Sequence, residues 1–472
     1  MNSFMYTLSG LFFILIFLGG IRLMNSPKTA VLGNLLSASG MFGAIILTLY
    51  GSGIINISSL WIALGIGGIL GYIMAVKVTM IKMPQMVALL NGLGGGASAG
   101  TAFVVIQSAS HDFSTVFAAA LALFVGGITF SGSLIASAKL DQKLSQRPIL
   151  LRGHTSFGFF TLLSTSIFLL VMPFASEEVS GILACLILIG SLLFGMIFTI
   201  RIGGADMPIT ISLLNSLSGV AGSIAGFAIN DPLLVATGAI VGSAGLILTR
   251  IMCRAMNRSL LEVLLGKTTS AGTAHPSHSL SLGHSQSDAA LQTHENIKQP
   301  GSDKQSIATL LAAKAVIIVP GYGMALSQAQ HQVKQLFDIL EKKGKDVKFA
   351  IHPVAGRMPG HMNVLLAEAD VPYEKLYEMD AMNPFFQDTD VVIIIGANDV
   401  VNPAATTAVG TPIFGMPILK VSEARNIMIF NKDTRPGYAG VDNPLFSQKR
   451  TSLFLGDAAE KIRELVEILN ES

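Results

Sequence analysis

The stretch Ala315–Gln330 reads AVIIVPGYGMALSQAQ and indicates the fold of the C-terminal part of the chain. An apolar, β-branched run ends at Pro320, and the turn Gly321-Tyr322-Gly323 follows at once. Apolar residues then recur at helical spacing, at Ala325, Ala329, Val333, Leu336, Phe337 and Leu340. Strand, glycine turn and helix predict the first unit of a dinucleotide-binding fold, whose tight turn lets a pyrophosphate approach backbone N–H groups. Leu326 stands where the fingerprint has its third glycine, so a plain strand–turn–helix connection remains an alternative.

The composition of the whole chain is typical of a membrane protein. Hydrophobic residues make up 51% of the 472 residues and charged residues only 13%. The apolar excess lies in the first part of the chain, where nine segments are long enough to span a bilayer. These segments are roughly 4–21, 30–50, 54–75, 86–108, 114–137, 155–174, 180–200, 208–229 and 232–252.

The charges between the spans predict the orientation. If the spans alternate, every Lys and Arg before residue 268 falls on one side, and the opposite loops hold only Asp112, Glu177, Glu178 and Asp231. Cytoplasmic loops gather Lys and Arg, so we expect the N-terminus outside and the C-terminal part in the cytoplasm. No Asp, Glu, His, Lys or Arg lies in the middle of a span, although a proton relay normally needs a titratable group there. If the protein moves protons, we expect the buried acid–base group on another chain.

The membrane part contains an internal repeat. Met83–Gly92 (MPQMVALLNG) reappears as Met207–Ser216 (MPITISLLNS), which makes Asn91 and Asn215 equivalent. Both copies start on the same side, so the repeat is parallel. Each Asn lies about 10 Å into the bilayer at helical rise and must find a partner. An interhelical hydrogen bond and the lining of a polar path are both open for this pair.

After the spans, the sequence predicts a linker and one soluble domain. We expect a transmembrane domain at 1–260, a flexible Ser/Thr/Gly/His-rich linker at 261–306 and an α/β domain at 307–472. The linker histidines have no regular ligand spacing, so we expect no metal site. Predicted strands and helices alternate as in a doubly wound parallel sheet, whose ligands bind beyond the carboxyl ends of the strands. The expected strands after the first are Val347–Ile351, Asp390–Ile395 and Asn426–Phe430, and the expected helices are Met362–Ala369 and Ala458–Leu469.

The loops after these strands favour NADP over NAD. The candidate loops are Pro320–Gly323, His352–Asn363, Gly396–Asn402 and Asn431–Gly440. The second strand ends without the acid that accepts a ribose 2′-hydroxyl in NAD sites, whereas Arg357, Lys432 and Arg435 are available for a phosphate. The alternative is that Lys432 and Arg435 are solvated turn residues. Asp399 either orients a ribose or amide, or caps the next segment.

The loops taken together resemble the β subunit of proton-translocating nicotinamide nucleotide transhydrogenase. The matching runs are PGYGMA from Pro320, HPVAGRMPGHMN from His352, GANDVVNP from Gly396, GYAGV from Gly437, GGADMP from Gly203 and MNRS from Met256. The resemblance implies hydride exchange between NAD(H) on a separate α chain and NADP(H) on this chain, coupled to proton passage. A sensor domain that gates an NADP-dependent channel or transporter without hydride transfer is the competing hypothesis.

The resemblance and the loops together predict the residues of each site. The expected NADP contacts are Gly321, Tyr322, Gly323, Val354, Ala355, Gly356, Arg357, Met358, Pro359, Gly396, Ala397, Asn398, Asp399, Val400, Gly415, Met416, Lys432, Arg435, Gly437, Tyr438, Asp457 and Ala458. Asp206 and Asn215 match polar positions tied to proton coupling, and Asn91, the repeat equivalent of Asn215, is expected on the same proton path. No protein acid or base is needed, because hydride passes directly between nicotinamides. The resemblance further implies a homodimer of α–β units in a bacterial inner membrane.

Two positions depart from the family pattern. Many members have a histidine where this chain has Asn91, and some relatives carry that histidine on a partner membrane chain. The usual Lys-Arg-Ser run of the last nucleotide loop is Asn431-Lys432-Asp433 here, so one cation is lost and one acid gained. Arg435 is then a candidate substitute for the lost contact to a 2′-phosphate.

Overall fold

The computed structural model describes most of the chain. The described residues are 3–79, 82–108, 112–141, 143–145, 148–149, 153–256, 258–265, 302–356, 360–411, 413–437 and 439–471. The predicted contacts Arg357, Met358, Pro359 and Tyr438 lie outside these ranges, as does most of the predicted linker. The chain forms two compact units, Met1–Arg250 and Ile251–Ser472, which are treated separately below.

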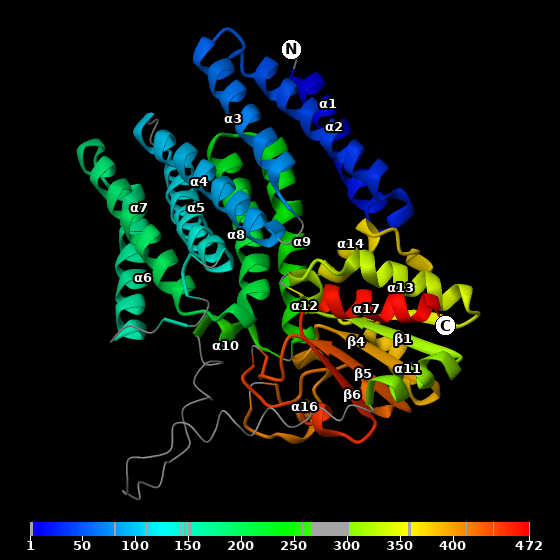
Figure 1. Cartoon of the computed structure of the whole chain (residues 1–472). Coiled ribbons are helices and arrows are strands. Elements are labelled where there is room, and N and C mark those ends of the chain that lie inside the picture. The colour runs from blue at the N-terminus through cyan, green and yellow to red at the C-terminus, as the bar shows by residue number, and fades with distance from the viewer. Residues whose placement is uncertain are drawn as a thin grey trace, which may run out of the picture. The chain divides into compact units, whose positions relative to one another are not determined.

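The first unit is all-helical (Figure 1). Within the described residues, nine helices are long and apolar enough to cross a membrane, which confirms the predicted membrane domain. They are α1 (Ser3–Leu23), α2 (Pro27–Gly51), α3 (Ser58–Lys77), α4 (Met83–Ser108), α5 (Phe113–Leu140), α6 (His154–Val171), α7 (Glu177–Ile200), α8 (Met207–Ala228) and α9 (Pro232–Ala255). Pro208 occupies the first turn of α8, where its missing N–H costs nothing.

Small residues let neighbouring helices of this unit approach closely. A Cβ on Gly95 of α4 would lie 2.7 Å from the Thr129 side chain of α5, and one on Gly219 of α8 would lie 2.4 Å from the backbone nitrogen of Gly242 on α9. Ser216 of α8 donates to the carbonyl of Gly242 at 2.7 Å. Because lipid provides no hydrophobic drive for helix association, such close packing and interhelical hydrogen bonds hold the bundle together.

One cation of α5 is buried among helix ends. The Lys139 side chain is 1% exposed, and its Nζ donates to the carbonyls of Ile200 at 2.5 Å and Ile202 at 2.8 Å. These carbonyls end α7 and the turn after it, where the helix leaves acceptors without intrahelical donors. A Lys at this position therefore closes the end of α7 electrostatically as well as by hydrogen bonding.

The second unit is built on six parallel strands in the order β3-β2-β1-β4-β5-β6. The strands are β1 (Ala315–Pro320), β2 (Asp346–Ile351), β3 (Leu376–Glu378), β4 (Val391–Ile395), β5 (Asn426–Asn431) and β6 (Thr451–Leu455). β1 and β4 pair in register from Val316 and Val391 to Pro320 and Ile395, so both strands end at the same edge. This is the strand order of the doubly wound dinucleotide-binding fold, and it confirms the predicted fold class.

Helices cover the sheet of the second unit. They are α11 (Ser302–Ala312), α12 (Tyr322–Leu326), α13 (Gln330–Lys342), α14 (His361–Glu368), α15 (Met379–Met382), α16 (Ala404–Thr407) and α17 (Ala458–Glu471), and α10 (Leu260–Leu265) precedes them. Figure 1 shows α13 and α17 side by side against the sheet. The helix α11 begins at Ser302, inside the stretch predicted as linker, and Ser306 pairs with Ser452 of β6 at 2.6 Å.

The structure differs from the sequence prediction after the glycine turn. The predicted single helix is broken into α12 and α13, because Gln328 adopts a left-handed φ of 53°. The apolar residues that recur at helical spacing, from Ala325 to Leu340, are nevertheless buried, whereas Leu326 is exposed. Two strands were also not predicted: the three-residue β3 and the half-buried β6, which are the two edges of the sheet.

Candidate functional site

The glycine turn lies at the topological switch point of the sheet. β1 has β2 on one side and β4 on the other, so the chain leaves the two central strands in opposite directions. Gly321 donates its N–H to Ile395 at 2.8 Å, and Gly323 donates to Gly396 at 2.8 Å. The turns after β1 and β4 are thus bonded to each other, and two of the turn's N–H groups are used inside the protein.

Only glycine fits at this crossing. Gly396 has a φ of +66°, and a Cβ on it would lie 2.3 Å from the Cα of Gly323. A Cβ on Gly321 would lie 2.4 Å from the carbonyl oxygen of Gly396. Because backbone atoms are met in each case, no side-chain rotation relieves the overlap. The two glycine motifs recognised in the sequence therefore form one structural unit at the carboxyl edge of the sheet.

The loop after β2 is organised by a buried histidine. His352 is 1% exposed, its Nε2 lies 2.8 Å from the carbonyl of Pro417, and its Nδ1 accepts from the N–H of Val354 at 3.2 Å. This pattern requires the neutral ring with the proton on Nε2. Burial lowers the pKa of His352 to about 4. Beside it, Ala355 is buried and donates to the His352 carbonyl at 3.0 Å.

The end of the same loop packs against the glycine turn. Gly356 has a φ of +104°, and a Cβ there would lie 2.5 Å from Nδ1 of His361. The rings of His361 and Tyr322 lie 6.5 Å apart between centroids. The loop after β2 and the turn after β1 are therefore in contact.

The loops after β4 and β5 are also joined. Asn398 donates through Nδ2 to the carbonyl of Arg435 at 2.9 Å, and Asp399 accepts the N–H of Ala439 at 3.1 Å. A Cβ on Gly437 would lie 2.6 Å from Oδ1 of Asp399, so only glycine lets the carboxylate come this close. The short helix at Asp399–Val401 has no side-chain cap. Asp399 is the first residue of this helix, and its carboxylate fixes the neighbouring loop by accepting the N–H of Ala439.

Buried asparagines that the sequence analysis did not single out support these loops. Asn431 donates to the carbonyl of Ala397 at 3.2 Å, and Asn443 donates to the Asn398 carbonyl at 3.2 Å. Asn402 donates to the carbonyl of Asp442 at 3.2 Å. Asn431 ends β5 and Asn402 follows β4, whereas Asn443 has no such sequence signal. Each amide replaces a hydrogen bond that a buried loop carbonyl would otherwise lack.

The remaining predicted contacts fall into three groups. Asp457 accepts the N–H of Ala459 at 2.9 Å at the start of α17, and Ala458 is the first residue of that helix, just after β6 at the same edge of the sheet. Gly415 donates to Ala405 at 2.8 Å with a φ of +76°, and Met416 packs on the small core around α16. Ala397 is buried, and Val400 packs against the main core, so those side chains serve packing.

Lys432 and Arg435 supply the positive charge of the loop after β5. Lys432 is exposed and, within the described residues, makes no ion pair. Arg435 is also exposed but is held by Asp433, which accepts its Nε at 2.8 Å and its Nη2 at 2.5 Å. The hydrogen bond from Arg435 keeps the pKa of Asp433 below its usual range.

In the membrane unit, Asn91 and Asn215 lie at the same level of neighbouring helices. A Cβ on Gly94 of α4 would lie 2.6 Å from Oγ of Ser218 on α8, and one on Gly222 would lie 3.8 Å from Oγ of Ser98. In each contact, the two residues are separated in the sequence by the same number of positions as Asn91 and Asn215. The repeated helices therefore pack on each other in the register of the repeat, with the two Asn one turn before the first contact.

The two asparagines differ in burial. Asn91 is 9% exposed, and its Nδ2 has no hydrogen-bond acceptor among the described residues. Asn215 is half-buried. Asp206 is 4% exposed, ends the turn Gly204–Asp206 and precedes α8 directly. Asp206 therefore stands at the beginning of the helix that carries Asn215, about two and a half turns before it.

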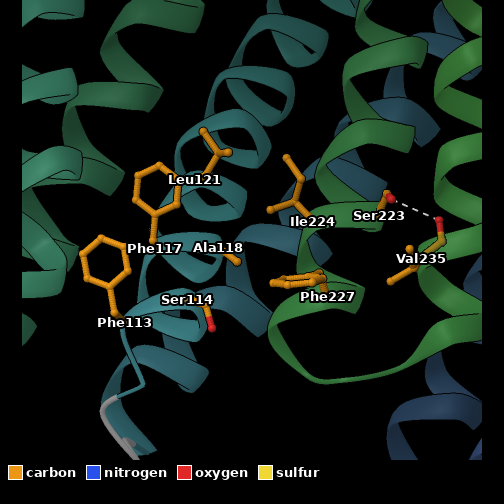
Figure 2. Close-up of a pocket in the computed structure, with 9 residues that line it drawn as sticks. All are labelled: Phe113, Ser114, Phe117, Ala118, Leu121, Ser223, Ile224, Phe227 and Val235. Carbon is orange, nitrogen blue, oxygen red and sulfur yellow. Dashed lines mark hydrogen bonds between the residues drawn. The ribbon is translucent and has the colours of Figure 1, made fainter.

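The membrane unit also has an apolar hollow of about 420 Å³ at the other end of α5 and α8. Figure 2 shows its aromatic walls from Phe113, Phe117 and Phe227, and the hydroxyl of Ser223 donating to the carbonyl of Val235. An apolar surface of this kind offers nothing to bind phosphates. The nucleotide site is therefore to be sought at the sheet edge.

A helical membrane unit followed by a parallel sheet with a glycine turn at its switch point defines a multi-pass membrane protein with a dinucleotide-binding type of domain. The chain matches the family model for the NAD(P) transhydrogenase beta subunit over residues 4–468 and belongs to that family. Two similar curated proteins, both named NAD(P) transhydrogenase subunit beta and both from Rhodospirillum rubrum, are each 40% identical over 474 residues, which cover 98% of either chain.

Family membership states the general function. The chain is a subunit of a proton-translocating transhydrogenase, an enzyme that uses nicotinamide nucleotides. As a beta subunit it works with an alpha subunit, and its apolar helices make it a multi-pass membrane protein. Nothing in the structure favours the competing hypothesis of a nucleotide-gated channel.

Proposed function

We propose that this chain binds NADP(H) at the carboxyl edge of its sheet, while NAD(H) binds the alpha subunit. The observation that carries the proposal is the convergence of the β1, β2, β4 and β5 loops around the crossed glycine turns. The cations Lys432 and Arg435 follow β5, and no acid ends β2 where a ribose 2′-hydroxyl would be bound. This distribution supports a 2′-phosphate near the β5 loop, with the predicted contacts distributed over the surrounding loops.

The residues of the chain would bind and orient the nucleotide rather than react with it. Hydride passes between two nicotinamide rings without a protein acid or base, so the protein must bring the rings together and exclude water. The crossed glycines hold the central turns rigidly, and Asp399 fixes the loop that carries Gly437 and Ala439. Lys432 and Arg435 would attract the 2′-phosphate.

A binding and exchange experiment tests this assignment. The full chain in lipid nanodiscs is titrated with NADPH and with NADH, alone and with the alpha subunit. We expect tighter binding of NADPH by the isolated chain, and hydride transfer from NADPH to an NAD analogue only with the alpha subunit present. Equal affinity for the two nucleotides in a Lys432→Gln/Arg435→Gln variant, but not in the unsubstituted chain, would support the role of the two cations. Binding of NADH alone would refute the assignment.

We further propose that Asn91, Asp206 and Asn215 belong to the proton path. The proposal is supported by the register of α4 and α8, which brings two equivalent amides to one level inside the bundle. An amide relays a proton only through water or a titratable neighbour, and the spans carry no titratable group at mid-depth. The carrier is accordingly expected on a membrane chain of the alpha subunit, where a histidine is the natural choice.

Proton pumping in vesicles tests this path. Asn91→Leu and Asn215→Leu should each abolish proton movement while NADPH binding is retained. The matched control is Asn34→Leu on α2, because Asn34 is exposed rather than set in the α4–α8 contact. Loss of pumping in the Asn34 variant as well, or normal pumping in both others, would exclude the proposed path.

The proposed setting completes the assignment. The chain would consist of a transmembrane domain at 1–260, a linker at 261–306 and the NADP(H) domain at 307–472. It would lie in a bacterial inner membrane with its N-terminus outside and its nucleotide domain in the cytoplasm, as the placement of Lys and Arg supports. Two α–β units would form the complete enzyme, embedded in lipid. Protease accessibility of 266–301 in sealed vesicles of known orientation tests the topology.

A further inference from the structure

The loop after β5 contains an ion pair that bears on nucleotide choice. Asp433 and Arg435 are two residues apart, and their side chains are 38% and 79% exposed. Three hydrogen bonds join them: Asp433 accepts the backbone N–H of Arg435 at 3.0 Å, its Nε at 2.8 Å and its Nη2 at 2.5 Å. The guanidinium therefore directs one N–H edge at a carboxylate within its own turn. That same planar edge is what a phosphate binds in bidentate fashion.

The pair stands at the edge where the nucleotide loops meet. β5 ends at Asn431, so Asp433 follows the strand by two residues. The carbonyl of Arg435 accepts from Asn398, which belongs to the turn after β4. The backbone under the pair is thus anchored to the loop beside the glycine crossing. The backbone of Arg435 is therefore held at this edge, whereas its exposed side chain is free to rotate once released from Asp433.

We infer that Asp433 sets the nucleotide preference of this chain by occupying the guanidinium of Arg435 and repelling a 2′-phosphate. This inference rests on the proposed NADP(H) site. A phosphate that uses Arg435 must displace the carboxylate or bind next to it, and either event weakens the phosphate contact. A ribose 2′-hydroxyl meets no such repulsion and can donate to a carboxylate. Lys432 then remains the cation that favours NADP(H) without hindrance.

The expected consequence is weak discrimination between the two nucleotides. With one unhindered cation and one neighbouring acid, the net charge presented by Lys432, Asp433 and Arg435 is +1 rather than +2. Neutralising the acid restores the second charge and frees the guanidinium. The effect of one such exposed charge is modest, about fivefold in affinity. Asp433 is a specificity-determining residue in this scheme and takes no part in hydride transfer.

Titrations of four full-length variants in nanodiscs test the inference. Asp433→Asn keeps the shape and removes the charge, and Arg435→Gln removes the cation. The double variant combines them, and Asp442→Asn removes another exposed charge between β5 and β6. We expect Asp433→Asn to tighten NADPH binding about fivefold and to leave NADH binding unchanged or weaker. The gain should disappear in the double variant, because it depends on Arg435. Asp442→Asn should change neither affinity.

The outcomes separate the inference from the proposed function. An unchanged NADPH-to-NADH affinity ratio in Asp433→Asn, with NADPH still bound, overturns the inference alone. An equal gain in Asp442→Asn, or a gain that persists in the double variant, also overturns it, because bulk charge would then explain the effect. Failure of every variant and of the unsubstituted chain to bind NADPH overturns the proposed function itself.

Discussion

The crossing of the two glycine turns predicts that Gly396→Ala will disrupt the nucleotide edge. At φ +66° an alanine costs about 1–2 kcal/mol relative to an ordinary backbone conformation. Its Cβ would also lie 2.3 Å from the Cα of Gly323 and 2.4 Å from the nitrogen of Met324. Overpacking against atoms that cannot rotate away adds about 1–3 kcal/mol. The loss of chain entropy in the unfolded state offsets about 0.4–1 kcal/mol.

Gly410→Ala is the matched control for this substitution. Gly410 has a comparable φ of +84°, but a Cβ there would meet nothing within 4 Å. It therefore shares the conformational cost and lacks the overlap. We expect a loss of about 1–5 kcal/mol in the opening free energy of β1 and β4 for Gly396→Ala, and of at most about 1.6 kcal/mol for Gly410→Ala.

Hydrogen exchange of the full chain in nanodiscs measures this difference. The slowest amides of β1 and β4 report the opening free energy of the sheet. NADPH titration of the same samples should show weaker binding for Gly396→Ala only. Equal losses for the two variants would refute the steric argument, since the left-handed conformation alone would then explain them.

Three further outcomes concern other positions of the chain. His352 has a pKa of about 4 in the folded state against 6.5 in the unfolded state. Its contribution to the free energy of unfolding is therefore fully present above pH 6.5 and falls by about 3 kcal/mol as the pH drops to 4. Denaturant titrations should show this pH dependence in the unsubstituted chain and not in His352→Gln. Gly219→Ala should destabilise the α8–α9 contact by about 1–3 kcal/mol. Gly100→Ala on α4 should not be destabilising, because a Cβ there would meet nothing within 4 Å. Thermal unfolding in detergent measures both variants. Asp390→Ala should cost about 1–2 kcal/mol in hydrogen exchange of β1, because its carboxylate accepts two backbone N–H groups and an Arg.

The sequence predicts the spans and the central strands well, for a simple physical reason. Length and apolar composition decide a span, and a buried parallel strand is a short continuous apolar run, as in Val391–Ile395. The edge strands lack this signal: β3 has only three residues, and β6 is half-buried. The left-handed conformation of Gln328 could not be predicted from the sequence either, because glycine or asparagine usually occupies such a position.

The candidate site shows a similar division. A glycine-rich loop after a strand is visible in the sequence, but the contact of Gly396 with Gly323 requires the pairing of β1 with β4, which is a long-range fact. The role of Asp399 in fixing the Gly437 loop likewise depends on two loops meeting. Asp433 and Arg435 are close in sequence, yet whether their side chains meet depends on the turn between them.

The register of α4 and α8 changes the interpretation of the membrane asparagines. A single Asn in a span is explained by one hydrogen bond to a neighbouring helix. Two equivalent Asn at one level of two contacting helices are a different arrangement. If the repeat served only helix packing, small residues would be needed at the contact, as at Gly94 and Ser98, and no Asn would be required. The amide of Asn91 also leaves a buried donor without an acceptor within the described part of the chain, at a cost of about 1–3 kcal/mol. Such a cost is retained at functional sites, and an acceptor supplied by the alpha subunit or by water would remove it.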